Sequence, residues 1–190
     1  LPFVAWAIWA WFRGRGGRVA EAPVRWWWAI LICLLAHPLI DAFTVYGTQL
    51  FWPLPMRPLM WSSLFIIDPL FTLPWLAACV VAWFARERIL AQRALVAGIA
   101  LGIAYVGWSL LAKSLVERAA RPALAALGLR DAPSFSVPMP FNTLLWRVVA
   151  MTPDGFVEGE RSLVADHGPM VFRAHASDLQ SLGAVSQLPA

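Results

Sequence analysis

The sequence has little charge for its length. Only 14% of its 190 residues are charged, whereas about 25% is usual for a soluble domain. Hydrophobic residues make up 60% of the chain, and the mean hydropathy is +0.65. A soluble core of this size cannot enclose so much apolar surface, so the composition predicts an integral membrane protein. The twelve tryptophans support this prediction, because tryptophan prefers the membrane–water interface.

Cysteine is also scarce, and the excess of positive charge is small. The two cysteines, Cys33 and Cys79, lie inside apolar runs and are interpreted as packing residues that say little about the redox compartment. The net charge is +4, and most basic residues are arginines at the ends of apolar segments, where the positive-inside rule accounts for them. We therefore expect membrane lipids, and not nucleic acid, as partners.

Four apolar segments can be distinguished, at about residues 1–12, 26–46, 61–84 and 94–111. The last three have roughly the 20 residues that a bilayer requires. The first is too short to span, and because the chain starts at Leu1 we expect it to be the end of a helix whose beginning is missing. The predicted fold is mainly α: a polytopic transmembrane helical bundle over 1–129, followed by a small β-containing soluble domain over 130–190.

Arginines determine the expected orientation. They concentrate between the first two segments and between the last two, at Arg13, Arg15, Arg18 and Arg25 and at Arg86, Arg88 and Arg93. The positive-inside rule places both of these loops in the cytoplasm. The loop at 47–60, which has only Arg57, and everything after the fourth segment are then expected on the outside.

The C-terminal part has a different character. Residues 113–127 carry charges on one face, which is typical of a helix lying on the membrane surface. A Pro- and Ser-rich connector follows at 131–140. Two strand-like runs, 142–151 and 156–165, are separated by the turn signal Thr152-Pro153-Asp154-Gly155. A β-hairpin therefore opens the soluble domain, which stops at Ala190 without a closing element and is expected to be incomplete.

Three polar residues share one face near the end of the second segment. His37 and Asp41 are four residues apart and Thr44 is three further on, so a helix places them on one stripe. Ionisable residues inside a membrane helix are energetically costly and usually functional. We therefore treat this stripe as the candidate site.

Asp68 in the third segment supplies a second carboxylate. At about 1.5 Å per residue, Asp41, His37 and Asp68 lie about 8, 13 and 10 Å from the outer ends of their segments. Because these segments run antiparallel, we expect the three groups in one layer, in the outer third of the bilayer. Pro38 and Pro69 each free a backbone carbonyl beside an ionisable residue, which predicts a polar cavity there.

One imidazole and two carboxylates suit Zn²⁺, Mn²⁺ or Fe²⁺. A metal ion would offset the cost of burying the carboxylates and would lower the pKa of a bound water. The same residues also suit an ion pair that holds helices together, between His37 and either Asp41 or Asp68, or a path for protons or ions. The residues alone leave these three interpretations open.

Other polar or unusual segments are weaker candidates. The outward loop at 47–60 is rich in proline and aromatic residues, and is interpreted as a segment lying in the membrane interface or as a hydrophobic lid that admits a lipid-like substrate. His167 and His175 are expected to be surface histidines, because their spacing matches no ligand motif. The Gly-rich run 13–17 is expected to be a cytoplasmic turn, since it lacks the lysine and the preceding strand of a phosphate loop.

The run 37–53, His-Pro-Leu-Ile-Asp-Ala-Phe-Thr-Val-Tyr-Gly-Thr-Gln-Leu-Phe-Trp-Pro, resembles the bacterial inner-membrane, LexA-regulated, inferred metal-dependent hydrolases (YdjM-like). That family's pattern has a His, an Asp four residues later, and then Thr, Gly and Trp-Pro at this spacing. Asp68-Pro69 is similar to the family's next-helix element, and the run 140–147 is similar to its soluble part. The resemblance covers about residues 26–165.

The resemblance implies a hydrolase of the bacterial inner membrane that acts on a lipid or phosphoester, with its C-terminal domain in the periplasm. His37, Asp41 and Asp68 would bind a divalent metal, Zn²⁺ or Mn²⁺, and Thr44 would orient Asp41 or a bound water. Further ligands would come from the family's upstream His-Arg and His-Ser pairs, which this sequence lacks, as expected if an N-terminal portion is missing.

Two alternatives belong to other classes of protein. The first is a non-catalytic membrane protein in which the polar cluster serves helix packing or ion passage. The second is an assembly protein whose outer domain binds a partner through Trp146 and Arg147.

Overall fold

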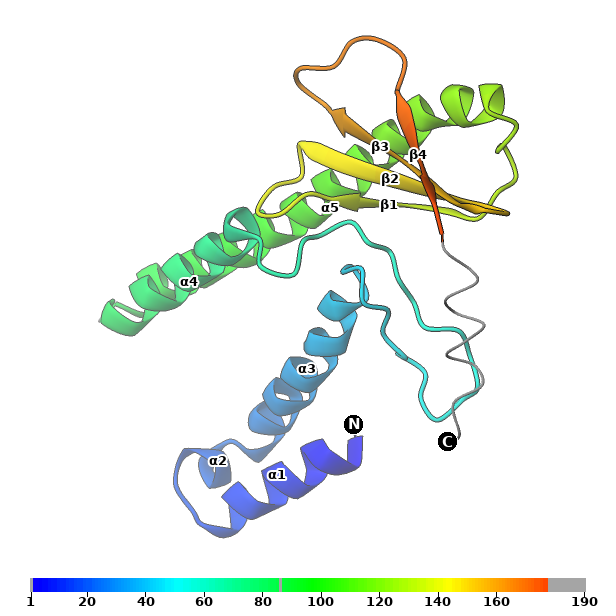
Figure 1. Ribbon diagram of the computed structural model, residues 1–190. Coiled ribbons are helices and arrows are strands. Elements are labelled where there is room, and N and C mark those ends of the chain that lie inside the picture. The colour runs from blue at the N-terminus through cyan, green and yellow to red at the C-terminus, as the bar shows by residue number, and fades with distance from the viewer. Residues whose placement is uncertain (1, 86, 178–190) are drawn as a thin grey trace. The chain divides into compact units, whose positions relative to one another are not determined.

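The computed structural model describes residues 2–85 and 87–177, so Leu1, Arg86 and the end of the predicted soluble domain lie outside the described residues. The helices are α1 (Pro2–Gly14), α2 (Arg18–Glu21), α3 (Pro23–Asp41), α4 (Pro69–Phe84) and α5 (Arg88–Ala126). The strands are β1 (Ser134–Pro138), β2 (Leu145–Thr152), β3 (Gly155–Ser162) and β4 (Phe172–Ala176) (Figure 1). The prediction of a mainly helical chain with a small C-terminal β-structure is confirmed.

The chain divides into two compact units, residues 1–61 and 62–190. Among the described residues, α3 and α5 are long and apolar enough to cross a membrane, and α4 is a shorter apolar helix of 16 residues. None of the 19 residues of α3 is buried. An apolar helix without a buried residue is expected where lipid covers most of its surface.

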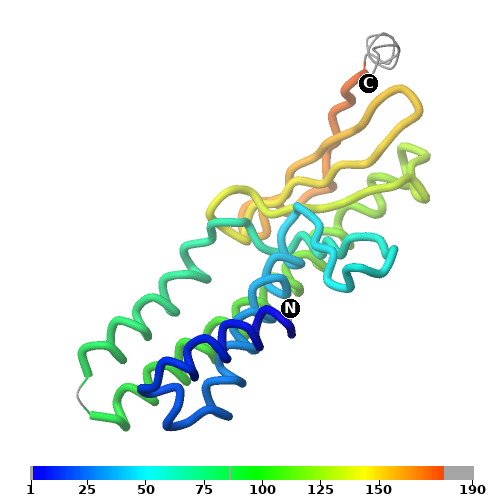
Figure 2. The backbone as a smooth tube through the Cα atoms, turned by 90° about the horizontal axis from the view of Figure 1, so that it is seen from below, coloured from blue at the N-terminus to red at the C-terminus, as the bar shows by residue number. Residues whose placement is uncertain are grey.

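In the first unit, α1 lies alongside α3 (Figures 1 and 2). The Trp9 indole N–H donates to the Pro23 carbonyl at 2.8 Å, and the Trp9 ring meets the edge of Trp27. Helix α3 begins three residues before the predicted segment, with Pro23 in its first turn. It ends at Asp41, five residues before the predicted end, because the Thr44 hydroxyl and backbone N–H both bind the Asp41 carbonyl.

In the second unit, α4 and α5 lie side by side (Figures 1 and 2). The prediction of a helix over 61–84 was wrong in its first eight residues. Asp68 is the N-cap of α4, since its carboxylate accepts the backbone N–H groups of Leu70 and Phe71 at 3.0 and 3.4 Å. Pro69 then occupies the first helical position, where its missing N–H costs nothing.

Helix α5 is one continuous helix of 39 residues, so the prediction of a separate surface helix at 113–127 was wrong. The apolar segment predicted at 94–111 lies within α5, which is long and apolar enough to cross a membrane. The second half of α5 buries a stripe of residues four apart, namely Ala112, Val116, Ala120 and Leu124. This stripe shares one hydrophobic core with the sheet residues Trp146, Val148, Ala150 and Val157. Contact with the sheet, which sequence periodicity does not reveal, therefore decides where this half of the helix packs.

The sheet is antiparallel, in the order β1-β2-β3-β4. The predicted hairpin is confirmed: β2 and β3 pair across the turn at 152–155. Strand β2 starts at Leu145, three residues later than predicted, because the Asn142 side chain accepts the N–H groups of Leu144 and Leu145 and forms a turn first. The interpretation of 131–140 as an irregular connector was wrong, since it contains β1, and β4 was not predicted.

Candidate functional site

His37 and Asp41 lie on the same face of the last two turns of α3. The His37 Nε2 and Asp41 Oδ2 atoms are 3.6 Å apart, and the side chains are 82% and 48% exposed. The helical spacing produces this pair, as the sequence predicted. An imidazole nitrogen and a carboxylate oxygen at this separation point outward together, so they can share a bound cation.

Thr44 lies in the same unit as this pair, but its hydroxyl does not contact the Asp41 side chain that it was predicted to orient. Its hydroxyl donates to the backbone carbonyl of Asp41 at 2.7 Å and leaves the Asp41 carboxylate alone. Thr44 is buried. Its contribution in the structure is therefore to stop the helix directly after Asp41, and any role in orienting a bound water stays a prediction.

Asp68 belongs to the second unit, so its meeting with His37 and Asp41 stays a prediction. It does not lie about 10 Å inside a helix, as the estimate from the sequence assumed, but at the first turn of α4. The residue as a whole is only 2% exposed. Besides its two backbone partners, it accepts the Tyr105 hydroxyl on Oδ2 at 2.7 Å.

The Tyr105 hydroxyl links Asp68 to Thr143, which precedes strand β2. It lies 3.2 Å from the Thr143 hydroxyl, which also accepts the indole N–H of Trp108 at 3.1 Å. Thr143 is fully buried, and its carbonyl accepts the Trp146 indole N–H. A chain of hydrogen bonds thus joins α4, α5 and the loop before β2.

Neither Tyr105 nor Thr143 was identified from the sequence. A signal was present for Tyr105, which is one of only two tyrosines and stands in the middle of the apolar segment at 94–111. A hydroxyl there needs a partner, because lipid offers none. Thr143 gave no signal, since one threonine in a turn region has no pattern that distinguishes it.

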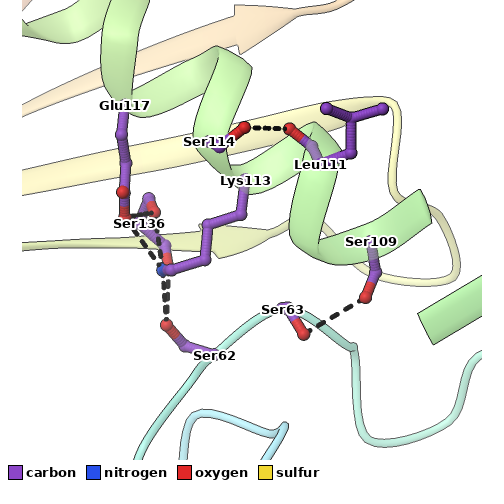
Figure 3. A network of polar contacts seen from close by, with 8 residues as sticks. All are labelled: Ser62, Ser63, Ser109, Leu111, Lys113, Ser114, Glu117 and Ser136. Carbon is purple, nitrogen blue, oxygen red and sulfur yellow. Dashed lines mark hydrogen bonds and ion pairs between the residues drawn. The ribbon is translucent and has the colours of Figure 1, made fainter. Parts of the chain in front are cut away.

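A second polar network surrounds Lys113 (Figure 3). The Lys113 ammonium donates to the Ser62 hydroxyl at 3.0 Å and to the carbonyl and hydroxyl of Ser136 at 2.9 and 2.8 Å, and it lies 3.2 Å from the Glu117 carboxylate. The Ser136 hydroxyl donates to Glu117. Ser62 has a positive φ of 44°, which this bonding holds in place.

The Lys113 network joins α5 to β1 and to the segment that precedes α4. Ser109 adds a further bond to Ser63 at 3.2 Å. Ser62 and Ser136 are both fully buried, and every ammonium proton has an acceptor. The arrangement therefore suits a structural clamp between elements, and not a reactive serine.

The face of the sheet away from α5 is charged. A concavity of about 560 Å³ there is lined by Arg147, Glu158, Glu160, Arg161, Asp166, His167 and Arg173, among others. Arg147 lies 2.8 Å from Glu160 and 3.7 Å from Glu158, and the hydrogen bond with Glu160 raises the pKa of the guanidinium above its ordinary value. Positive and negative groups balance, so the surface selects no single charge of ligand.

The structure also tests three minor predictions. The prediction that His167 and His175 are surface residues is confirmed. Cys33 and Cys79 are both exposed, so their interpretation as packing residues was wrong: an apolar run does not show which helix face is covered. Trp146 is fully buried, so the idea that it binds a partner protein was also wrong.

Within residues 2–85 and 87–177, no three His, Cys, Asp or Glu side chains lie close enough together to hold a metal ion. The arrangement that the structure shows is a two-residue one, His37 with Asp41. It offers one imidazole nitrogen and one carboxyl group, both accessible.

Comparison with known proteins supports the prediction of a membrane protein that was made from the apolar segments. The family described as YdjM inner membrane protein matches residues 1–116, a stretch that includes His37, Asp41 and Asp68. No curated protein matches the chain. No solved structure matches it either. Because the family match covers more than half of the 190 residues, the chain belongs to the YdjM inner membrane protein family.

Proposed function

We propose that this inner-membrane protein is a divalent-metal-dependent hydrolase whose metal is held by His37 and Asp41, with Asp68 as a third ligand. The observation that carries the proposal is the accessible His37–Asp41 pair at 3.6 Å. Imidazole with carboxylate suits Zn²⁺, and also Mn²⁺. Among residues 2–61 of the first unit, the structure shows no hydrogen bond between either side chain and another side chain, so a metal would displace only their mutual contact.

Asp68 can also act as a metal ligand, but most of its carboxylate lone pairs already accept hydrogen bonds. A carboxylate offers about four lone-pair sites, and the Leu70 N–H, the Phe71 N–H and the Tyr105 hydroxyl occupy three of them. One site stays open for a metal. The three donors would hold the carboxylate in one orientation, which is how the supporting groups of metal ligands usually act.

A bound divalent ion would supply Lewis-acid chemistry, polarising the carbonyl or phosphoryl oxygen of a substrate. The residues of the chain would orient and hold it. Asp41 would supply negative charge, and His37 would keep its other ring nitrogen free for a polar contact. The Thr44 hydroxyl would keep α3 from continuing, which leaves the Asp41 side chain at the helix end. The substrate class we propose is a lipid or lipid-like phosphoester.

Location supports a membrane-bound substrate. Two of the proposed ligands, His37 and Asp41, lie at the end of α3 opposite the Arg-rich segment at 13–25. With that segment in the cytoplasm by the positive-inside rule, a multi-pass arrangement would place the site toward the periplasmic face, together with the C-terminal sheet.

Metal analysis of the purified full chain tests the proposal. We expect bound metal in the wild type, and at least a severalfold lower content in His37→Gln and in Asp41→Asn. Asp166→Asn, which removes an exposed carboxylate from the sheet unit, serves as the matched control and is expected to keep its metal. Absence of metal from the wild type, or equal content in Asp41→Asn and Asp166→Asn, would contradict the assignment.

A second candidate is a non-catalytic membrane protein. The observation that favours it is the hydrogen bonding of the Asp68 carboxylate, which accepts three donors and already has a structural role as the cap of α4. If this alone is its role, Asp68→Asn lowers the thermal stability equally with and without a chelator. If Asp68 is also a ligand, a chelator lowers the stability of the wild type and leaves that of Asp68→Asn unchanged.

A further inference from the structure

The loop at 47–60 follows α3 and has no role in the proposed metal site. It contains no Asp or Glu, and Arg57 is the single charged residue between Asp41 and Asp68. Its large apolar side chains are mostly exposed: Phe51, Trp52, Leu54, Met56 and Met60. Trp52 reaches 76% exposure. Exposed apolar side chains concentrated in this way mark a surface that contacts something other than water.

The backbone of this loop is already largely hydrogen-bonded to itself. Thr48 and Leu59 exchange two N–H···O=C bonds, of 2.8 and 2.9 Å, and close the loop at its base. From residue 48 to residue 59, six of the nine non-proline residues donate their N–H to a backbone carbonyl within the loop: Thr48, Leu50, Trp52, Leu54, Met56 and Leu59.

Pro53, Pro55 and Pro58, which complete the twelve residues from 48 to 59, have no N–H to satisfy. Unsatisfied backbone groups are what excludes irregular segments from lipid. A loop with so few free donors can therefore enter the boundary between headgroups and acyl chains at small cost, whereas an ordinary polar loop cannot.

Continuity with α3 indicates which surface the loop meets. Helix α3 has no buried residue, and the residues between Arg25 and His37 are all apolar, as expected for a helix whose side away from α1 faces lipid. The loop begins six residues after that helix ends, which places it at the bilayer boundary. Tryptophan concentrates at this depth, and a lone arginine there binds lipid phosphate while its aliphatic stem lies along the acyl chains.

We propose that the loop at 47–60 inserts into the interfacial layer of the phospholipid bilayer, with its apolar side chains among the acyl chains and Arg57 at the phosphates. The inference does not depend on the proposed hydrolase, because it uses none of the metal ligands. The loop would act as a second membrane anchor directly beside the end of α3.

Spin-label accessibility in the full chain tests this insertion. Cys33→Ser and Cys79→Ser remove the native thiols, and a nitroxide is then attached at Leu54→Cys, Met56→Cys or, as a control at the exposed β2–β3 turn, Asp154→Cys. The protein is reconstituted in vesicles of phosphatidylethanolamine and phosphatidylglycerol. Collision of the label with oxygen, which concentrates in lipid, is compared with collision with a water-soluble nickel chelate.

We expect an oxygen-to-nickel ratio severalfold higher at positions 54 and 56 than at position 154. The additional change Arg57→Glu, which puts an anion at the phosphates, is expected to lower the ratio at both loop positions. Nickel accessibility equal to that at position 154 would show a loop in water. Protection from both reagents would show a loop covered by protein. Either result would overturn the proposal.

Discussion

At the scale of single residues, a few buried polar side chains determine how the second unit is joined. Asp68 caps α4 and binds Tyr105 of α5, and Lys113 of α5 binds Ser62 and Ser136. Buried polar groups that keep their partners cost little, whereas removing one partner exposes the full desolvation cost of the other. These contacts therefore specify the position of α4 and of the sheet on α5.

Tyr105→Phe is expected to destabilise the protein by about 1–2 kcal/mol, because it removes the hydroxyl from the buried Asp68 carboxylate and the Thr143 hydroxyl. Denaturant titration in detergent measures this change. The matched control is Tyr46→Phe at the other tyrosine, which is 73% exposed and should change stability little. Equal effects of the two substitutions would mean that the Tyr105 contact contributes nothing.

At the scale of elements, composition and hydropathy predicted which segments are helical, and local chemistry determined where they end. The apolar runs at 26–46 and 61–84 each contain a helix, but the ends are set by the side-chain contacts of Thr44 and Asp68. Those contacts need no apolar pattern, so hydropathy alone extended both helices too far.

Among the strands too, those with a local sequence signal were predicted, and those that depend on distant contacts were not. The hairpin at 142–165 was predicted because a Pro-Asp-Gly turn separates two β-prone runs, which is a local signal. Strands β1 and β4 are five residues long, and they become strands by pairing with β2 and β3. A pairing partner distant in sequence cannot be identified from a short run, and β1 moreover ends in Pro138.

The contact between α4 and α5 depends on two glycines of α5. A Cβ atom on Gly98 would lie 2.7 Å from the Cβ of Ala78, and one on Gly102 would overlap the Trp75 indole ring. These glycines are four residues apart, the small-residue spacing that lets membrane helices approach closely.

Gly98→Ala is therefore expected to destabilise the protein by about 1–3 kcal/mol, since the added methyl group forces the helices apart. Gly107→Ala on the same helix is the matched control. An added Cβ there meets no atom within 4 Å, so the higher helix propensity of alanine should leave stability unchanged or raise it by up to about 1 kcal/mol. Thermal unfolding in detergent distinguishes the two variants, and a loss of equal size in both would contradict the close contact.

At the scale of the whole molecule, the sequence predicted part of the candidate site. The His37–Asp41 pair follows from helical spacing and is confirmed. The contacts of Asp68 with Tyr105 and of Thr44 with the Asp41 carbonyl were not predicted, because they depend on where helices end and on which side chains meet across them. The family match agrees with the membrane assignment that composition predicted.

Orientation is a property of the whole chain that labelling in intact cells can check. In a background of Cys33→Ser and Cys79→Ser, a membrane-impermeant maleimide should label Asp154→Cys in the β2–β3 turn. It should label Glu21→Cys, in the Arg-rich segment, only after the inner membrane is permeabilised, since arginine-rich loops stay in the cytoplasm. Labelling of both positions in intact cells, or of Glu21→Cys alone, would reverse or refute the arrangement.

Binding of a divalent metal by His37 is tested most directly by pulsed electron paramagnetic resonance of the Mn²⁺-loaded full chain. The chain has three histidines, so the origin of an imidazole nitrogen coupling can be assigned by substitution. We expect the nitrogen coupling in the wild type and in the double variant His167→Gln/His175→Gln, and its loss in His37→Gln. A coupling that persists in His37→Gln, or that disappears only in the double variant, would contradict the assignment.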